Sequence, residues 1–134
     1  MSFENIKFYA MPTAFRHLGF FPDQSPHWIW TAQKINKFIV NTSTPNPPRI
    51  LNLFGYSGLA SLHAASNGAS VTHVDASKKA ISFAFENRNL SSFSNLPIKY
   101  LTDDALKFVN REIRRENRYD AIILDPPKYG RGPN

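Results

Sequence analysis

The residue types best suited to chemistry lie in the segment Asp125-Pro126-Pro127-Lys128, which directly follows an apolar run. The two prolines fix the backbone and carry no N–H, so the segment offers a carboxylate and carbonyl oxygens as hydrogen-bond acceptors. Such an acceptor-only cluster suits a planar amino group or the edge of a nucleobase. The alternative is a rigid turn that only ends a strand. We expect Asp125, Pro126 and Pro127 to be catalytic and to orient an acceptor.

A glycine-containing segment, Phe54-Gly55-Tyr56-Ser57-Gly58, is the second candidate. It joins an expected strand to an expected helix, where glycines let a ligand approach the backbone beside the free N–H groups of a helix start. The dinucleotide pattern G-x-G-x-x-G is not matched, because the two glycines are followed by Leu59-Ala60-Ser61. Taken alone, the segment is explained equally well by a plain strand-to-helix turn.

An acidic residue, Asp75, ends the next expected strand and is followed by Ala76. A carboxylate in this place can accept hydrogen bonds from both hydroxyls of an adenosine ribose. The alternative is that Asp75 or Ser77 caps the following helix. Because a glycine segment precedes it, we favour the ribose role.

The pair Asp104-Ala105 opens another expected helix just after a strand. The carboxylate could accept the amino group of an adenine, and the next backbone N–H could meet a ring nitrogen. The alternative is again capping, with Asp103 or Asp104 at the start of the helix.

Alternating strands and helices must position these segments. Short apolar runs and helical periodicity predict strands at 49–54, 71–74, 98–101 and 120–124 and helices at 57–67, 77–89 and 104–117. This alternation predicts an α/β fold, a Rossmann-like parallel sheet with flanking helices. Ligands bind such sheets outside the carboxyl ends of the strands, which is where all four candidate segments fall.

The first 48 residues differ from the rest. Residues 1–30 are aromatic-rich and read as irregular, because Pro12, Gly19, Pro22 and Pro26 interrupt any long helix. A helix is expected at 31–40, and a proline-rich linker follows at 41–48. We therefore divide the chain into a lead-in, 1–48, and a partial cofactor-binding core, 49–134.

The amino-acid composition excludes some kinds of chemistry and favours one kind of partner. The 134 residues include no cysteine, which excludes disulfides, thiolate metal sites and a cysteine nucleophile from this chain. Lys and Arg number 16 against 10 Asp and Glu, a net charge of +6 that favours RNA as a partner. No membrane span or signal peptide is recognisable, so a cytoplasmic protein without a membrane is expected.

Two further features bear on ligands. The four histidines, His17, His27, His63 and His73, show no metal-ligand spacing and read as turn or surface residues, so no metal is expected. The helix at 104–117 has a basic stripe opposite an apolar one. The stripes are Lys107, Arg111, Arg114 and Arg118, and Ala105, Val109 and Ile113. The basic stripe could face RNA, although an ordinary solvated helix explains it better.

Together these segments resemble the class I S-adenosylmethionine-dependent methyltransferases, over about residues 49 to 130. The resemblance rests on Leu51 through Gly58, Val74 through Ser77, Asp104-Ala105 and Asp125 through Lys128. More narrowly, the chain is similar to bacterial methyltransferases of the ribosomal RNA large subunit. Those proteins often carry a Gly-x-Phe-x-Asp-Gln segment, which the run Gly19-Phe20-Phe21-Pro22-Asp23-Gln24 resembles.

The resemblance implies roles for individual residues and S-adenosyl-L-methionine as the cofactor. Phe54, Gly55, Tyr56, Ser57 and Gly58 would pass under its methionine portion. Asp75 and Ala76 would bind the ribose. Asp104 and Ala105 would frame the adenine, Gln24 would lie near the cofactor, and Asp125 would face the methyl group.

The family normally builds a seven-stranded sheet, whereas only four strands are expected here. This predicts an incomplete core with an apolar edge beside Ile122 and Leu124 that pairs with a second copy or a missing C-terminal portion. One alternative to an RNA methyltransferase is therefore a truncated, inactive protein that still binds the cofactor. Another is a nicotinamide-dependent oxidoreductase, which the absent G-x-G-x-x-G argues against.

Overall fold

The computed structural model describes residues 1–10 and 22–127 of the 134-residue chain. The strands are β1 (Ser2–Phe3), β2 (Ile6–Lys7), β3 (Arg49–Leu53), β4 (Ser70–Asp75), β5 (Ile98–Thr102) and β6 (Ala121–Leu124). The helices are the short 3-10 helix η1 (Pro22–Gln24), α1 (Ser25–Asn41), α2 (Leu59–Ser66), α3 (Lys78–Leu90) and α4 (Ala105–Arg114). The four predicted strands of the core and its three predicted helices are thus present, with bounds that shift by a few residues.

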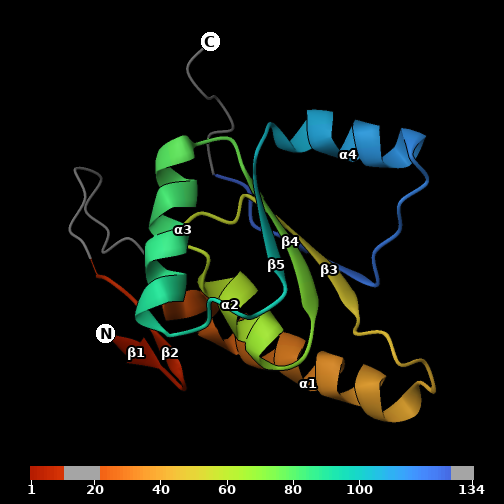
Figure 1. Ribbon diagram of the computed structural model, residues 1–134, viewed down its shortest axis with the longest axis horizontal. Coiled ribbons are helices and arrows are strands. Elements are labelled where there is room, and N and C mark those ends of the chain that lie inside the picture. The colour runs from red at the N-terminus through yellow and green to blue at the C-terminus, as the bar shows by residue number, and fades with distance from the viewer. Residues whose placement is uncertain (11–21, 128–134) are drawn as a thin grey trace.

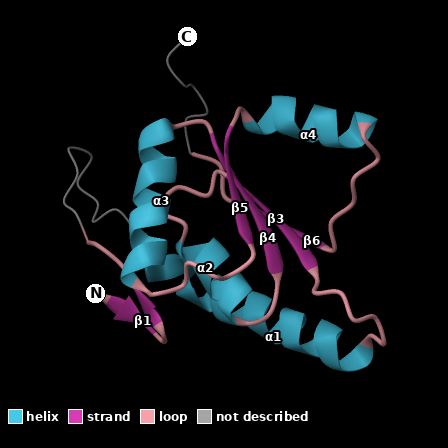
Figure 2. Ribbon diagram, in the orientation of Figure 1, coloured by secondary structure: helices cyan, strands magenta, loops and turns pink. Residues whose placement is uncertain are grey.

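Strands β3 to β6 form one parallel sheet in the order β5-β4-β3-β6. Along the chain, β4 and β5 are added one after the other on one side of β3, and β6 is then added on its other side. Helices α1, α2 and α3 lie on one face of this sheet and α4 on the other (Figures 1 and 2). The predicted α/β fold with a Rossmann-like parallel sheet is confirmed.

Alternate residues of the strands build the core under α1 and α2. Ile50 and Val71 are paired in register and pack against Ile35 of α1 and against Ala64 and Ala65 of α2. Small residues on α2 let this helix approach the sheet closely, because alanine adds little bulk between backbones. The helix at 31–40 of the predicted lead-in therefore shares a core cluster with the sheet.

The opposite face of the sheet is built around Phe108 of α4. Its side chain is 3% exposed and packs against Leu51, Leu53 and Val74. Ile122 and Leu124 of β6 pair with Leu51 and Leu53, so they point to this same face, yet each is 60% exposed. Among the described residues, α4 leaves the β6 end of the face uncovered. The apolar surface predicted at this edge is confirmed.

The prediction that residues 1–30 are irregular was wrong for the described parts of this range, 1–10 and 22–30. Strands β1 and β2 pair as a short antiparallel hairpin. Ile6 of β2 and Phe8, just after β2, are buried against α2. Helix α1 begins at Ser25, earlier than predicted, and Pro26 lies in its first turn. A proline is tolerated there because the first N–H groups of a helix have no partner within the helix.

The apolar stripe predicted for α4 was also wrong in part. Phe108 and Glu112 are the buried side chains of this helix, while Ile113 is 67% exposed. The stripe that contacts the sheet is centred on Phe108, one position away from the expected one. The basic stripe is interrupted as well, since the helix ends at Arg114 and Arg118 lies beyond it.

Within residues 1–10 and 22–127, the helices are too short or too polar to cross a lipid bilayer.

Candidate functional site

The loops that follow β3, β4 and β5 meet at the carboxyl edge of the sheet and are joined by hydrogen bonds. The Gly55 N–H donates to the carbonyl of Val74 at 3.1 Å. The Tyr56 N–H donates to Asp75 Oδ2 at 3.0 Å, and the Asp103 N–H donates to the Asp75 carbonyl at 3.0 Å. Asp75 is thus the residue that connects all three loops.

The fourth loop leaves β6 on the other side of β3. Because Leu53 and Leu124 are paired in register, Phe54 and Asp125 leave adjacent parallel strands side by side. Asp125, Pro126 and Pro127 are exposed. The glycine segment therefore sits at the point where the strand order reverses, which is the usual ligand site of an open parallel sheet.

The segment after β3 holds an unusual backbone. Phe54, Tyr56 and Gly58 adopt positive φ angles of 56°, 48° and 81°. For residues with a side chain this left-handed region costs on the order of 1–3 kcal/mol each, and such strain concentrates at ligand sites. The Gly58 N–H closes the turn on the Gly55 carbonyl at 3.0 Å, and α2 begins at the next residue.

Of the two residues that the sequence offered as the cap of α3, the structure selects Ser77, and the ribose role of Asp75 stays a prediction. Ser77 is the N-cap of α3, and its Oγ accepts the Ala80 N–H at 3.2 Å. Asp75 instead accepts one backbone N–H on each oxygen, from Tyr56 on Oδ2 at 3.0 Å and from Ser77 on Oδ1 at 2.9 Å. A carboxylate can accept about four hydrogen bonds, so both oxygens retain capacity for a ligand.

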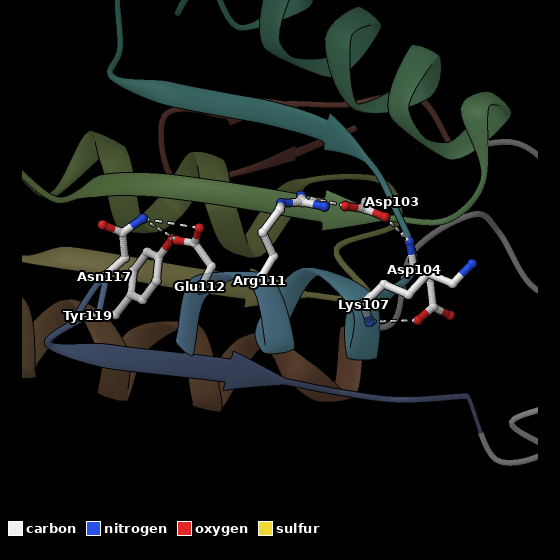
Figure 3. A network of polar contacts seen from close by, with 7 residues as sticks. All are labelled: Asp103, Asp104, Lys107, Arg111, Glu112, Asn117 and Tyr119. Carbon is white, nitrogen blue, oxygen red and sulfur yellow. Dashed lines mark hydrogen bonds and ion pairs between the residues drawn. The ribbon is translucent and has the colours of Figure 1, made fainter. Parts of the chain in front are cut away.

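Asp104 caps α4, as the alternative interpretation of this position predicted. Its Oδ1 accepts the Lys107 N–H at 2.9 Å, and Ala105 is the first residue of the helix (Figure 3). The neighbouring Asp103 accepts the Asp104 N–H at 2.8 Å and forms an ion pair with Arg111 at 2.6 Å. The hydrogen bond from Arg111 lowers the pKa of Asp103. One stripe arginine is therefore committed to the protein's own carboxylate.

The other end of α4 is anchored by Glu112, which is 8% exposed. Tyr119 Oη donates to its carboxylate at 2.5 Å, and Asn117 Nδ2 donates to both of its oxygens at 3.1 and 3.2 Å (Figure 3). Burial opposes ionisation of Glu112, but the hydrogen bonds from Tyr119 and Asn117 and the charges of Arg115 and Arg111 together lower its pKa. Burial and the hydrogen bond to Glu112 raise the pKa of Tyr119 to about 12.

Comparison with known proteins places this geometry in a family. Residues 31–132 match the family described as Conserved hypothetical protein 95. The chain belongs to this family. Its structure is similar to the crystal structure of the SAM dependent methyltransferase from Agrobacterium tumefaciens, with a TM-score of 0.89 and 48% identity over 98% of this chain and 40% of that one.

Two other similar proteins bear on the ligand and the substrate. The crystal structure of SMU.776 complexed with SAH has a TM-score of 0.65 and 26% identity, covering 86% of this chain and 28% of that chain. The ribosomal RNA large subunit methyltransferase K/L of Shewanella sp. strain MR-4 is 40% identical over 83 residues, 60% of this chain and 12% of that protein. These similarities confirm the resemblance to S-adenosylmethionine-dependent methyltransferases. The chain spans about a quarter or less of the curated relatives it matches.

One predicted site residue, Gln24, does not belong to the four loops. Gln24 ends η1 and stands at the N-cap position of α1, half-buried, so its place near a cofactor stays a prediction. The segment Gly19-Phe20-Phe21 that suggested it lies outside the described residues. Within the described ranges, no three His, Asp or Glu side chains gather where a metal ion could bind.

The prediction of surface histidines was wrong for two residues of this family member. His63 and His73 are 1% and 0% exposed. His73 lies directly beneath Gly55 and is held by a buried chain of hydrogen bonds from Asn52 through Ser61. Sequence reasoning missed these three residues, although period-two alternation in β4 places His73 on the same face as the buried Val71.

Proposed function

We propose that this protein binds S-adenosylmethionine at the carboxyl edge of its sheet and takes part in methyl transfer to RNA. The observation that carries the proposal is Asp75, whose two oxygens each accept one backbone N–H at the switch point of the sheet. The unused lone pairs of both oxygens suit the two hydroxyls of a ribose. The 48% identity to the Agrobacterium methyltransferase, over almost the whole chain, supports this cofactor.

The cofactor-binding residues then surround Asp75. The turn from Phe54 to Gly58 would hold the methionine portion and Ala76 would lie beside the ribose. Asp104 keeps one oxygen beyond its capping bond, so it can cap α4 and still accept the adenine amino group, next to Ala105. Gln24 is proposed as a further contact.

The acceptor would be oriented by the loop after β6. Bound S-adenosylmethionine supplies a methyl group on a positively charged sulfur, which makes the methyl carbon electrophilic. The Asp125 carboxylate and the carbonyls of Pro126 and Pro127 accept hydrogen bonds from an amino group, so they can hold a nucleobase edge in place. The contribution of these residues is orientation, which by itself lowers the barrier of a two-reactant step substantially.

RNA as the substrate is supported by relatives and by charge. The Shewanella protein and a 37% identical protein of Alteromonas mediterranea are named methyltransferases of the ribosomal RNA large subunit. The net charge of +6 favours a polyanion.

Calorimetry on the 134-residue chain tests the cofactor. S-adenosylhomocysteine and NAD are titrated in parallel, and we expect heat of binding only for the first. Saturable binding of NAD with none of S-adenosylhomocysteine would point to the oxidoreductase alternative.

A second function, cofactor binding without transfer, is favoured by the uncovered Ile122 and Leu124 beside the proposed acceptor loop. The labelled methyl group of S-adenosylmethionine, followed into ribosomal RNA, separates the two functions. Binding with label transfer supports the methyltransferase, whereas binding without transfer supports the second function.

A further inference from the structure

Three polar side chains stand side by side beneath the glycine turn. Asn52, His73 and Tyr100 are register partners on β3, β4 and β5, so they project from the same face of the sheet. Ser61 of α2 closes over two of them, because Asn52 Nδ2 donates to its Oγ at 2.8 Å and the same Oγ lies 2.8 Å from His73 Nδ1. Asn52, Ser61 and His73 are 3%, 0% and 0% exposed.

This chain of hydrogen bonds holds the imidazole through one of its two nitrogens. The Asn52 amide donates to Ser61 Oγ, and the same oxygen is hydrogen-bonded to His73 Nδ1. The other ring nitrogen, Nε2, is buried and has no hydrogen-bond partner among the described residues. Burial lowers the pKa of His73 to about 4, so the ring is neutral at physiological pH. The ring is therefore fixed at one end only.

The Cε1 edge of the ring occupies the space that a side chain at Gly55 would need. A Cβ atom added to Gly55 would lie 2.2 Å from His73 Cε1, 2.5 Å from Nδ1 and 2.6 Å from Nε2, distances that real Cβ contacts essentially never show. Gly55 is not among the residues with positive φ, so its backbone would accept other residue types. Gly58 differs, because its φ of 81° lies in the left-handed region that favours glycine. At position 55 it is the histidine that requires glycine.

Two hydrogen bonds connect the contact between His73 and Gly55 to the residues proposed to bind the cofactor. Gly55 donates to the Val74 carbonyl, and the next N–H, that of Tyr56, donates to Asp75. A shift of Gly55 away from His73 would carry the Tyr56 N–H away from Asp75 and would turn the carboxylate. The position of the imidazole therefore sets the geometry of the group proposed to hold the ribose.

We infer that His73 is a positioning residue of the cofactor site: its ring is the floor on which the turn Phe54–Gly58 rests, and it makes glycine obligatory at position 55. The inference rests on the proposed binding of S-adenosylmethionine. In this account, position 55 is glycine because His73 leaves no room for a side chain, and not because a ligand approaches the backbone there. His73 itself touches neither cofactor nor substrate in this account.

A double-mutant cycle tests the coupling. In the unaltered background, Gly55→Ala should weaken binding of S-adenosylhomocysteine by about tenfold or more, since the methyl group displaces the turn. In a His73→Ala background the space is open, and Gly55→Ala should change the affinity by less than about twofold. His73→Ser is carried in parallel in case the alanine variant does not fold. Gly68→Ala, at the other edge beside Ile39, is the control: its φ of 106° makes this substitution costly for stability, but it should show no coupling to position 73.

A ligand-free measurement separates this inference from the proposed function. Amide hydrogen exchange of Tyr56 reports its bond to Asp75, and we expect its protection to fall in His73→Ala and His73→Ser. The amide of Arg49, which donates to Asp120 at the opposite end of β3, should keep its protection. Failure of the unaltered chain to bind S-adenosylhomocysteine removes the proposed function, and amide exchange then decides alone. Additive effects of the two substitutions on affinity, or full Tyr56 protection in both His73 variants, would overturn the inference.

Discussion

Asp75 Oδ2 accepts the backbone N–H of Tyr56 at 3.0 Å, and this bond ties the end of β4 to the strained turn after β3. Tyr56 has a φ of 48°, so its N–H is held toward Asp75 by an arrangement that an isolated chain would rarely adopt. The same proximity acts on the side chain, because burial and the negative charge of Asp75 raise the pKa of the Tyr56 hydroxyl. The turn therefore holds in one orientation the carboxylate that we propose for binding the ribose.

Replacing Asp75 with alanine should therefore weaken binding of S-adenosylhomocysteine by about 2–3 kcal/mol, the worth of hydrogen bonds to a charged group. Glu86→Ala, which removes an exposed carboxylate on α3, is the control and should bind normally. Titration calorimetry on both variants gives the comparison. Equal affinities for the two would show that Asp75 does not hold the ribose.

The packing of α4 can be tested at Phe108. Phe108→Ala should lower the free energy of unfolding by about 3–5 kcal/mol, because it empties the centre of the cluster formed with Leu51, Leu53 and Val74. Leu106→Ala on the same helix removes a side chain that is 69% exposed and should change stability by less than about 0.5 kcal/mol. Urea denaturation of both measures the difference. A similar loss of stability in both variants would mean that α4 does not pack on the sheet through Phe108.

Stability should depend on Glu112 in acid. The pKa of Glu112 is lower in the folded chain than its usual 4.5, so the ionised carboxylate favours the folded state above that pH. This contribution is lost as the pH falls through the lowered pKa, because a protonated carboxyl group is a weaker acceptor for the bonds from Tyr119 and Asn117. Glu112→Gln should therefore be less stable at neutral pH and show a flatter profile below pH 4.5. Denaturation midpoints of both proteins across this range are the measurement, and parallel profiles would contradict the assignment.

The uncovered face of β6 should make the isolated chain associate. Ile122 and Leu124 are both 60% exposed on an edge strand, which is a surface that other apolar surfaces or strands can cover. Sedimentation velocity should show mass increasing with concentration, and Ile122→Lys should reduce that increase. Leu106→Lys, on α4, provides an equally exposed comparison. A monomer at all concentrations would refute the expectation.

The absence of cysteine from the 134 residues limits the reaction. Methylation at C5 of a pyrimidine usually needs a thiolate that adds to C6, so this chain should not perform it unaided. The acceptors of Asp125, Pro126 and Pro127 suit an exocyclic or ring nitrogen better. Nucleoside mass spectrometry of RNA incubated with the chain should show no 5-methylcytosine, and its appearance would reject this prediction.

Local sequence was enough for the alternation of the core and for its ligand edge. The apolar run from Ile50 to Leu53 and the periodicity around Ile81 are short-range signals, and they predict strands and helices with small errors at the ends. The parallel direction of the strands follows from these elements, because successive strand–helix units can connect in few ways. Asp75 and Asp125 could be assigned to one edge for the same reason.

Tertiary structure decided what each of these residues contacts. Whether Asp75 or Ser77 caps α3 depends on where the turn after β3 lies, and no pattern within 75–77 contains that information. The side of α4 that is buried depends on where Phe108 packs on the sheet. The helical period alone therefore predicted that Ile113 is buried, although it is exposed. His73 of β4 contacts Gly55, which follows the neighbouring strand β3, and this contact exists only when the two strands pair in register. Backbone alternation is a local property of the chain, whereas hydrogen bonds and side-chain packing between elements arise only on folding.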